Sequence, residues 1–234
     1  MDKETKVLDY HDVLLYRTDI DLLTGDKWLN DQIVSFFFEY LQLEKYARLK
    51  DIFFCGGSLS FLLLHGDPLD LEAMVAPLKL RERELVLFAC NDNPDPSSAG
   101  GGSHWSLLTY TKQDSTFRHY NSAMGLNEEA ATGLATNAWN LLGSGGKLKY
   151  RNVYIPRQIN SYDCGLYMLG TADIIAESYS QGLQGADVVV GTRLTPDAVH
   201  KMRSHILDLI MERAGKVSKP QSSKLNSHEL DVKH

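Results

Sequence analysis

Three runs of strand-forming residues in the middle of the chain constrain its fold more than any other feature. Residues 84–90 (ELVLFAC), 105–110 (WSLLTY) and 116–120 (TFRHY) are apolar, aromatic or β-branched, and each run has the length of a β-strand. Segments rich in turn-forming residues separate them. The pattern predicts neighbouring strands of one sheet, and residues 52–55 and 148–155 are expected to form further strands.

A long irregular segment, residues 91–103 (NDNPDPSSAGGGS), separates the first two of these runs. It contains two prolines and three consecutive glycines, which break regular structure. Long loops inside compact domains are usually functional or mobile. We expect this loop to be a mobile element that becomes ordered over a bound ligand.

Helical periodicity is present on both sides of the predicted strands. The clearest helix follows Asn30 and Asp31, either of which can cap it. Its apolar residues at helical spacing are Ile33, Phe36, Phe37, Tyr40 and Leu41. Further helices are expected near residues 58–64, 71–78, 127–142 and 164–179, and from a Thr195 cap, with Pro196 at the first position, to about residue 213. Helices grouped around a central cluster of strands predict an α+β fold.

The chain is expected to form one folded domain. It has 234 residues and no visible internal repeat. Residues 216–234 (KVSKPQSSKLNSHELDVKH) are polar and have almost no periodic apolar residues. We therefore assign residues 1–215 to the domain and predict that residues 216–234 form a disordered tail.

The charge balance argues against a protein that binds nucleic acid. The chain has 24 basic and 30 acidic side chains and a formal net charge of −6, whereas nucleic-acid-binding proteins neutralise phosphates with basic residues. The apolar runs are far shorter than the ~20 residues that cross a bilayer, and the N-terminus lacks the apolar region of a signal peptide. We expect no membrane contact and a location in the cytosol or nucleus.

The three cysteines, Cys55, Cys90 and Cys164, form neither a CxxC motif nor a Cys/His pair at zinc-binding spacing. Their odd number in a chain expected inside the cell argues against a disulfide framework, and no metal or cofactor is expected. Cys164 stands at the start of a predicted helix, where the helix dipole and free N–H groups stabilise a thiolate. It is a candidate nucleophile, and the alternative is a buried cysteine that only fills space.

His104 and Asn121 are polar residues at the ends of two adjacent predicted strands. If these strands pair as an antiparallel hairpin, the start of one lies beside the end of the next, so the two side chains can touch. Asn121 could then accept a hydrogen bond from one imidazole nitrogen and leave the other to take a proton from Cys164. Taken singly, His104 could equally be a surface residue at a strand end, and Asn121 a turn-forming residue.

Four motifs occur in order along the chain. They are Trp28-Leu29-Asn30-Asp31, His104-Trp105-Ser106-Leu107-Leu108, His119-Tyr120-Asn121-Ser122, and Gln158 followed by Asp163-Cys164-Gly165. In this set of motifs the sequence resembles the ubiquitin-like-protein-specific cysteine proteases of the sentrin-specific, adenain-like superfamily. The resemblance covers roughly residues 7–214. The NDN…GG…HWSLL loop and the QxNSYDCG segment are most similar to the deneddylating members.

The resemblance implies a papain-like, adenain-like fold, in which helices flank a central mixed or antiparallel sheet and the catalytic cysteine lies at a helix N-terminus. It implies that Cys164 is the nucleophile, that His104 is its base and later the acid, and that Asn121 orients the imidazole. The side-chain amide of Gln158 would stabilise the developing oxyanion together with the N–H of Cys164. Such an interaction is worth ~3 to 4 kcal/mol in other enzymes.

The resemblance also assigns residues to the C-terminal Gly-Gly tail of a ubiquitin-like modifier. Trp28 and Trp105 would enclose this tail in a tunnel too narrow for any residue with a Cβ. Asp31 and Asn93 would bind the tail. The two tryptophans could instead be ordinary core residues, and Asp31 could be a helix cap.

Position 121 departs from the family pattern. The family has aspartate there, at the same spacing from the histidine, and this chain has Asn121. Losing the carboxylate costs roughly 10⁴ in turnover in a serine triad, but papain-like cysteine enzymes orient the ring with asparagine. Normal, reduced and absent activity are all compatible with the sequence.

The motif set predicts a cysteine isopeptidase that removes a Nedd-type ubiquitin-like modifier from lysines and can also process the precursor of that modifier. One alternative is a protease for SUMO or ubiquitin conjugates. Another, suggested by Asn121, is a module that binds a modifier's tail without cutting it. The expected partners are the modifier and its conjugates, such as neddylated cullins, and the protein is expected to act as a monomer.

Overall fold

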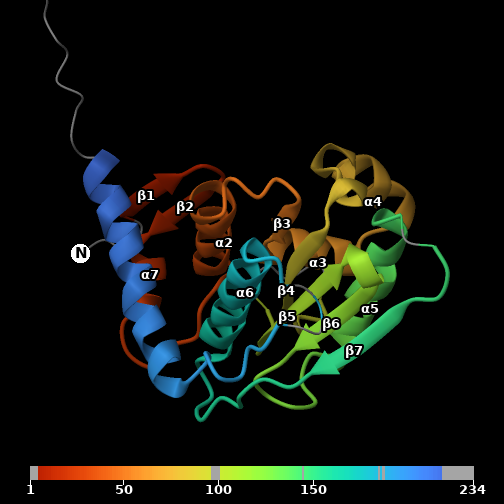
Figure 1. The fold of residues 1–234 in the computed structure, drawn as a ribbon. Coiled ribbons are helices and arrows are strands. Elements are labelled where there is room, and N and C mark those ends of the chain that lie inside the picture. The colour runs from red at the N-terminus through yellow and green to blue at the C-terminus, as the bar shows by residue number, and fades with distance from the viewer. Residues whose placement is uncertain (1–4, 96–100, 144, 184, 186–187, 218–234) are drawn as a thin grey trace, which may run out of the picture.

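The centre of the protein is a mixed sheet of five strands in the order β3-β4-β5-β6-β7 (Figure 1). The computed structural model describes residues 5–95, 101–143, 145–183, 185 and 188–217. The strands of the sheet are β3 (Ile52–Cys55), β4 (Leu85–Asn91), β5 (Trp105–Thr111), β6 (Thr116–Tyr120) and β7 (Lys149–Val153). β4, β5 and β6 are antiparallel neighbours, and β3 and β7 pair in parallel at the two edges.

Helices cover both faces of the sheet. They are α1 (Arg17–Ile20), α2 (Asp31–Tyr40), α3 (Gly57–His65), α4 (Pro68–Val75), α5 (Glu128–Leu141), α6 (Cys164–Ser180) and α7 (Pro196–Val217). A π-helical turn (Leu41–Lys45) continues α2, and the short 3-10 helices are Asp21–Leu23, Ala76–Leu78, Leu80–Glu82 and Lys112–Asp114. A separate antiparallel hairpin consists of β1 (Lys6–Tyr10) and β2 (Val13–Tyr16).

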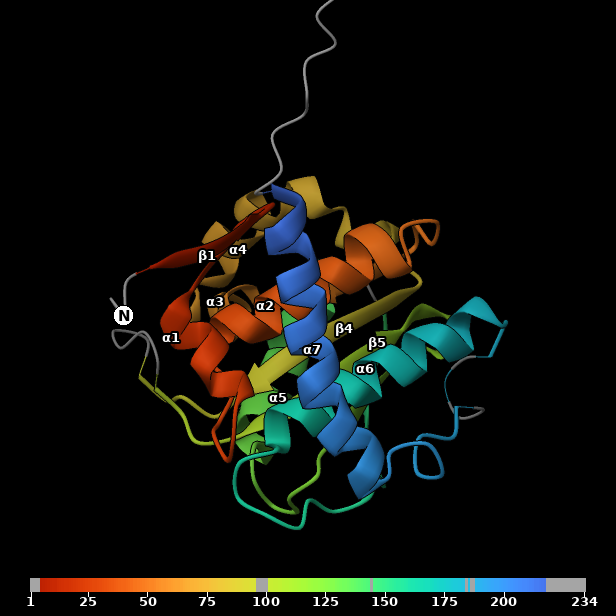
Figure 2. The ribbon, with the colours of Figure 1, turned by 90° about the vertical axis from the view of Figure 1, so that its left-hand side faces the viewer.

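The sheet separates two hydrophobic cores, because successive side chains of a strand point to opposite faces. In β4, Leu85, Leu87 and Ala89 join the core formed with α2, α6 and α7. Val86 and Phe88 face the other way and pack with α3, α4 and α5. Figure 2 shows α7 lying outside α2 and α6 on the first of these sides. Burial of both faces explains why β4 is apolar almost without interruption.

The predicted α+β fold is confirmed, and of the two kinds of central sheet that were expected, mixed or antiparallel, the protein has the mixed one. Each of the five predicted strands forms, and each predicted helix is present. The helix expected near residues 71–78 begins earlier, at Pro68, and ends at Val75, where a 3-10 turn takes over because Pro77 lacks an N–H. The hairpin of β1 and β2 was not predicted, since strands of five and four residues are too short to show a clear alternation.

Two sequence predictions fall partly on residues that the structure does not describe. Residues 96–100 of the predicted mobile loop and residues 218–234 of the predicted tail lie outside the described residues. α7 continues to Val217, so the first two residues of the predicted tail are helical. Within the described part of the chain, no helix combines the length and the apolar character needed to cross a bilayer.

Candidate active site

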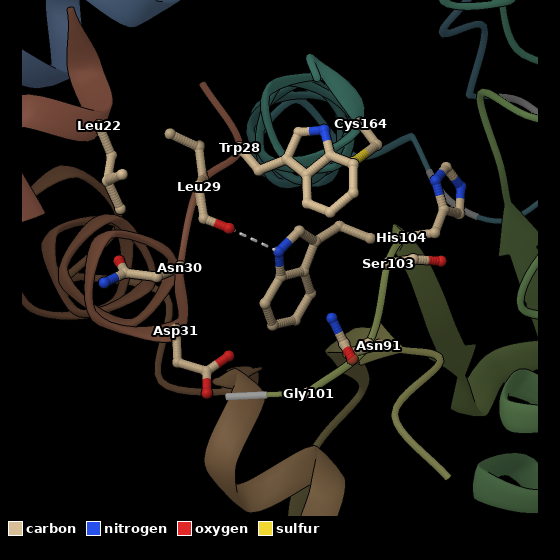
Figure 3. Close-up of a pocket in the computed structure, with 12 residues that line it drawn as sticks. Leu22, Trp28, Leu29, Asn30, Asp31, Asn91, Gly101, Ser103, His104 and Cys164 are labelled. Carbon is tan, nitrogen blue, oxygen red and sulfur yellow. Dashed lines mark hydrogen bonds between the residues drawn. The ribbon is translucent and has the colours of Figure 1, made fainter. Parts of the chain in front are cut away.

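Cys164 lies in a pocket of about 280 Å³ at the edge of the sheet where β4 ends and β5 begins. The N-termini of α2 and α6 complete its walls. Figure 3 shows Cys164 and His104 at one end of this pocket and Asp31 at the other. The lining residues are Leu22, Trp28, Leu29, Asn30, Asp31, Asn91, Gly101, Gly102, Ser103, His104, Trp105 and Cys164.

Cys164 is the first residue of α6, as the sequence predicts. Burial raises the pKa of its thiol, and the N–H groups of Trp105 and Gly165 lower it in part. Cys55 and Cys90 do not line the pocket, and burial raises the pKa of each to about 12. Cys164 is therefore the cysteine whose surroundings allow it to act as a nucleophile.

Asn121 holds the ring of His104 in one orientation. Nε2 of His104 lies 2.7 Å from Oδ1 of Asn121. The same oxygen accepts a hydrogen bond from the N–H of Ala123 (2.9 Å), and Nδ2 of Asn121 donates to the carbonyl of Leu126 (2.5 Å). Because these bonds turn the amide oxygen toward the ring, His104 donates from Nε2 and its Nδ1 is left as a base. Asn121 thus touches the imidazole and also forms a turn.

His104 is a buried residue rather than a surface residue at a strand end. Burial lowers its pKa, and the hydrogen bond to Asn121 raises it in part. Within the described part of the chain, no hydrogen bond joins the ring to Sγ of Cys164. Since the pKa of the thiol is raised and that of the imidazole is lowered, both groups are mainly uncharged in the free protein at neutral pH.

The main chain of His104 is anchored from two sides. Oδ1 of Asp92 accepts hydrogen bonds from the N–H groups of Ser103 (2.5 Å) and His104 (2.9 Å). Nδ2 of Asn127 donates to the carbonyls of His104 (3.1 Å) and Cys90 (3.2 Å). These bonds join the ends of β4 and β5 to the start of α5, so the position of the imidazole is set by three elements.

The two tryptophans occupy different environments. Trp105 is 5% exposed, and its Nε1 donates to the carbonyl of Leu29 (2.9 Å), the dashed line in Figure 3. Trp28 is 49% exposed, and its Nε1 donates to the carbonyl of Ser161 (2.6 Å). Trp28 is therefore not an ordinary core residue, whereas Trp105 belongs to the core and also lines the pocket.

The far end of the pocket is formed by the start of α2. The side chain of Asn30 accepts a hydrogen bond from the N–H of Ile33 and caps the helix, which leaves Asp31 as the first helical residue. Asp31 is free of the capping role and lines the pocket, where burial raises its pKa. A Cβ at Gly57, the first residue of α3, would lie 3.0 Å from the ring of Trp105 and 3.4 Å from Oδ1 of Asp31, so α3 packs closely against these two side chains.

Gln158 and Asn93 do not line the pocket. Oε1 of Gln158 accepts a hydrogen bond from Oγ of Ser122 (2.7 Å), and its Nε2 donates to the carbonyl of Asn160 (2.7 Å). Asn93 lines a separate cavity, where its carbonyl lies 3.1 Å from Nε2 of His65. The roles suggested for both residues remain predictions.

The chain was compared with protein families and with curated proteins. A model described as the Ulp1 protease family, C-terminal catalytic domain, matches residues 98–206. The NEDD8-specific protease 1 of Arabidopsis thaliana is 35% identical over 213 residues, which cover 88% of this chain and 93% of the relative. The chain belongs to the Ulp1 protease family. Sentrin-specific protease 8 of Mus musculus is 34% identical, over 90% of this chain and 94% of the relative.

Solved structures agree with this assignment at the level of the fold. A structure of the SUMO protease Ulp1, with its catalytic cysteine oxidized to a sulfenic acid, has a TM-score of 0.70 at 19% identity and covers 90% of both chains. The C-terminal Ulp1 protease domain in complex with Smt3, the yeast ortholog of SUMO, has a TM-score of 0.68 at 17% identity, over 92% of this chain and 90% of that one. The predicted family resemblance and the predicted fold are both confirmed.

This Ulp1-family protein is thus a cysteine protease, and its pocket contains the groups that such chemistry uses. It offers a thiol at a helix N-terminus, an imidazole with a free Nδ1, and backbone N–H groups beside the sulfur. A nucleophile, a base and an orienting group are the parts of a catalytic triad. Among the described residues, no group of three or more His, Cys, Asp or Glu side chains is arranged to hold a metal ion.

Sequence reasoning missed three residues that hold this Ulp1-family site together. Asp92 and Asn127 anchor the main chain of His104, and Arg203 forms an ion pair with Asp163, the N-cap of α6. Asp92 stands in the NDN motif, and Asn127 at a predicted helix start. Their contacts cross between elements, so no local spacing shows them.

Proposed function

We propose that this protein is a cysteine isopeptidase that removes a NEDD8-type modifier from lysine side chains and also processes the precursor of that modifier. The observation that carries the proposal is the pocket itself, in which Cys164 and His104 lie at one end and two tryptophans are among the lining residues. The names of relatives that are 33–35% identical over about 90% of the chain support NEDD8 as the modifier.

In the proposed mechanism, Nδ1 of His104 takes the proton of Cys164 as the sulfur attacks the carbonyl carbon of the modifier's last glycine. The C–N bond to the lysine then breaks, and the imidazolium gives its proton to the leaving amine. Water activated by His104 hydrolyses the thioester and restores the thiol. The free protein starts with both groups uncharged, so proton transfer accompanies the attack.

The N–H of Cys164 and the amide of Gln158 are the proposed donors to the oxyanion. An amide nitrogen carries two hydrogens, and one of those on Gln158 bonds to the carbonyl of Asn160. The other is proposed to bond to the substrate oxygen. Ser122 holds Oε1 of Gln158 and so fixes which end of the amide is a donor.

Tail binding is proposed for Trp28, Trp105 and Asp31, which border the pocket, and for Asn93 beside the loop. A tail that ends in two glycines is proposed to lie along these residues, because Trp28 and Trp105 both line the pocket that holds Cys164. The proposed partners are the modifier and its conjugates, such as neddylated cullins, and the proposed working form is a monomer in the cytosol or nucleus.

The proposal is tested with modifiers that carry an electrophile in place of the terminal carboxyl. A NEDD8 probe is expected to form a covalent adduct with the native protein and with Cys55→Ala, and none with Cys164→Ala. Probes made from SUMO and ubiquitin, at the same concentration, report on the choice of modifier. Faster labelling by one of these than by NEDD8 would reassign the substrate, and no labelling of folded native protein by any of the three would reject the isopeptidase.

A second function, binding a modifier's tail without cutting it, is favoured by Asn121. An amide stabilises an imidazolium less than a carboxylate does, and in a serine triad this change is severe. The variant Asn121→Asp separates the two functions. A rise in turnover by orders of magnitude at unchanged affinity would identify the native protein as a binder, and equal turnover would support the enzyme.

A further inference from the structure

The ring of His104 has a neutral partner, so the charge that stabilises its protonated form must come from elsewhere. The amide of Asn121 fixes the ring through one hydrogen bond but carries no net charge. A buried imidazolium without a nearby negative charge is costly. The position of negative charge around His104 therefore decides how easily this ring accepts a proton.

Titratable side chains come from each of the elements around His104 and the pocket. They are Asp92 directly after β4, Cys164 on α6, Asp31 on α2, His119 on β6 and Glu128 at the start of α5. Among these described groups, only Asp92 hydrogen-bonds to His104 itself. Asp31 lies at the opposite end of the pocket, and Glu128 acts on His119.

The carboxylate of Asp92 is held in place by three hydrogen bonds. Oδ1 accepts from the N–H groups of Ser103 (2.5 Å) and His104 (2.9 Å), and Oδ2 accepts from Oγ of Ser103 (2.7 Å). Burial raises the pKa of Asp92, but these bonds outweigh burial and keep the pKa below its usual value. Asp92 is therefore ionised at neutral pH and cannot move away from His104 without losing its partners.

We propose that Asp92 is the charge partner of His104, supplying from the main-chain side of the residue the negative charge that Asn121 does not supply from the ring side. Asp92 is not itself a lining residue of the pocket and contacts it through the hydrogen bonds from Ser103 and His104, so it is a positioning residue that acts through His104. The effect of Asp92 on catalysis rests on the proposed isopeptidase function, whereas the effect of Asp92 on the protonation of the His104 ring does not.

Coulombic attraction supports this assignment. Asp92 raises the pKa of His104 through its charge, which opposes the larger effect of burial and adds to the larger effect of the hydrogen bond to Asn121. Asp92 also raises the pKa of the Cys164 thiol, where it is the smallest of the named causes. Because its oxygen bonds to His104's own N–H, we expect the charge to favour the imidazolium more than it disfavours the thiolate. The net effect is easier transfer of the proton from sulfur to nitrogen.

The test is the pKa of His104, measured by NMR from the ring resonances of the free protein, which needs no proteolysis. In Asp92→Asn the amide oxygen keeps both main-chain hydrogen bonds and loses the charge, and the pKa of His104 is expected to fall by about half a unit or more. The control Asp9→Asn removes the same charge from an exposed ion pair on β1 and should leave that pKa unchanged.

A rescue variant separates charge from loop structure. In Asp92→Asn combined with Asn121→Asp, a carboxylate returns on the ring side, and the pKa of His104 should recover to the native value or above. If Asp92→Asn does not fold, Asp92→Ser retains one acceptor without charge and should show the same fall. An unchanged His104 pKa in a folded Asp92 variant would overturn the proposal.

The pH dependence of turnover then tests whether the charge of Asp92 affects the reaction. If the protein is an isopeptidase, Asp92→Asn is expected to move the acid limb of kcat/KM to lower pH and to reduce kcat. A purely structural loss at this loop would reduce activity without moving that limb. A changed His104 pKa in a protein that cleaves no modifier would uphold the charge partner and reject the isopeptidase function.

Discussion

His104 illustrates how much of a reactive residue's behaviour is set by atoms other than its own. Its ring is oriented by Asn121, and its main chain is held by Asp92 and Asn127. Burial favours the neutral imidazole, and in the same pocket burial favours the neutral thiol of Cys164. In the free protein the site is consequently a pair of uncharged groups, and the proton moves from Cys164 to His104 when the sulfur attacks the carbonyl of a bound substrate.

The raised pKa of Cys164 leads to a prediction for the free protein. Iodoacetamide reacts with thiolates, so alkylation of Cys164 is expected to be slow at neutral pH and to accelerate through the alkaline range, with a midpoint above the usual thiol value. Mass spectrometry of protein quenched at each pH measures the rate. Cys164→Ala should show no alkylation while folded, because Cys55 and Cys90 lie outside the pocket and burial raises the pKa of each to about 12. A rate already at its plateau at pH 7 would instead reveal a preformed thiolate–imidazolium pair.

Gly102 is predicted to be irreplaceable in the wall of the pocket. Its φ is +86°, and a Cβ built there would lie 1.9 Å from Oδ1 of Asn91, which is fixed by a hydrogen bond from the N–H of Asn93. Gly102→Ala is expected to destabilise the fold by about 1 kcal/mol or more, measured by urea denaturation, and to slow labelling by the NEDD8 probe. Gly145→Ala, where a Cβ meets nothing within 4 Å, is the matched control. Equal stability of the two variants would contradict this prediction.

At the scale of elements, α7 fixes the start of the helix that carries the nucleophile. Arg203 of α7 is buried and donates to Oδ1 of Asp163 (2.7 Å). It also donates to the carbonyls of Leu22 (2.6 Å) and Lys27 (2.9 Å), in the segment that leads to Trp28. The guanidinium of Arg203 thus links α7, the N-terminus of α6 and the segment between residues 22 and 27, which leads to Trp28 in the pocket wall.

Removing this guanidinium should cost more than removing an exposed one. Arg203→Met leaves Oδ1 of Asp163 and two carbonyls without the hydrogen bonds from Arg203, and we expect a loss of about 3 kcal/mol in the free energy of unfolding. Arg193→Met, which removes an exposed ion pair with Glu177, should cost less than about 1 kcal/mol. Urea denaturation of both variants measures the difference, and similar losses would show that Arg203 is not a structural link.

The elements also show where prediction from sequence succeeds. β5 and β6 were predicted as neighbouring strands because aromatic and β-branched residues are concentrated in two short runs with a turn between them. They pair as an antiparallel hairpin, which brings His104 and Asn121 together. The hairpin of β1 and β2 was missed, since its strands are short and a third of its side chains are exposed. Strong local patterns come from elements buried on both faces, and the N-terminal hairpin is not one of them.

For the whole molecule, buried histidines make stability depend on pH. Burial lowers the pKa of both His104 and His119 below the 6.5 of an unfolded chain. Below pH 6.5 the unfolded chain therefore binds more protons at these two histidines than the folded protein does. Their contribution to the free energy of unfolding is lost as the pH falls from 6.5 toward the lower pKa values of the folded protein. The contribution is fully present above 6.5.

Chemical denaturation at pH 7.5 and pH 6 tests this dependence. The native protein is expected to be less stable at pH 6, and His119→Gln should show a smaller difference because one of the two buried histidines is gone. Asp31 and Glu39, whose pKa values are raised by burial, act in the opposite direction at lower pH, so the comparison stops at pH 6. Equal stability of the native protein at both values would contradict the prediction.

The sequence by itself determined the strands and helices around the site, the position of Cys164 at a helix start, and the family, because these depend on residues that are neighbours or stand in ordered motifs along the chain. Only the tertiary structure decided that Asp92 bonds to His104 and that Gln158 and Asn93 lie outside the lining of the pocket. Contacts of this kind join separate elements across the fold, and their geometry depends on packing that no local pattern encodes.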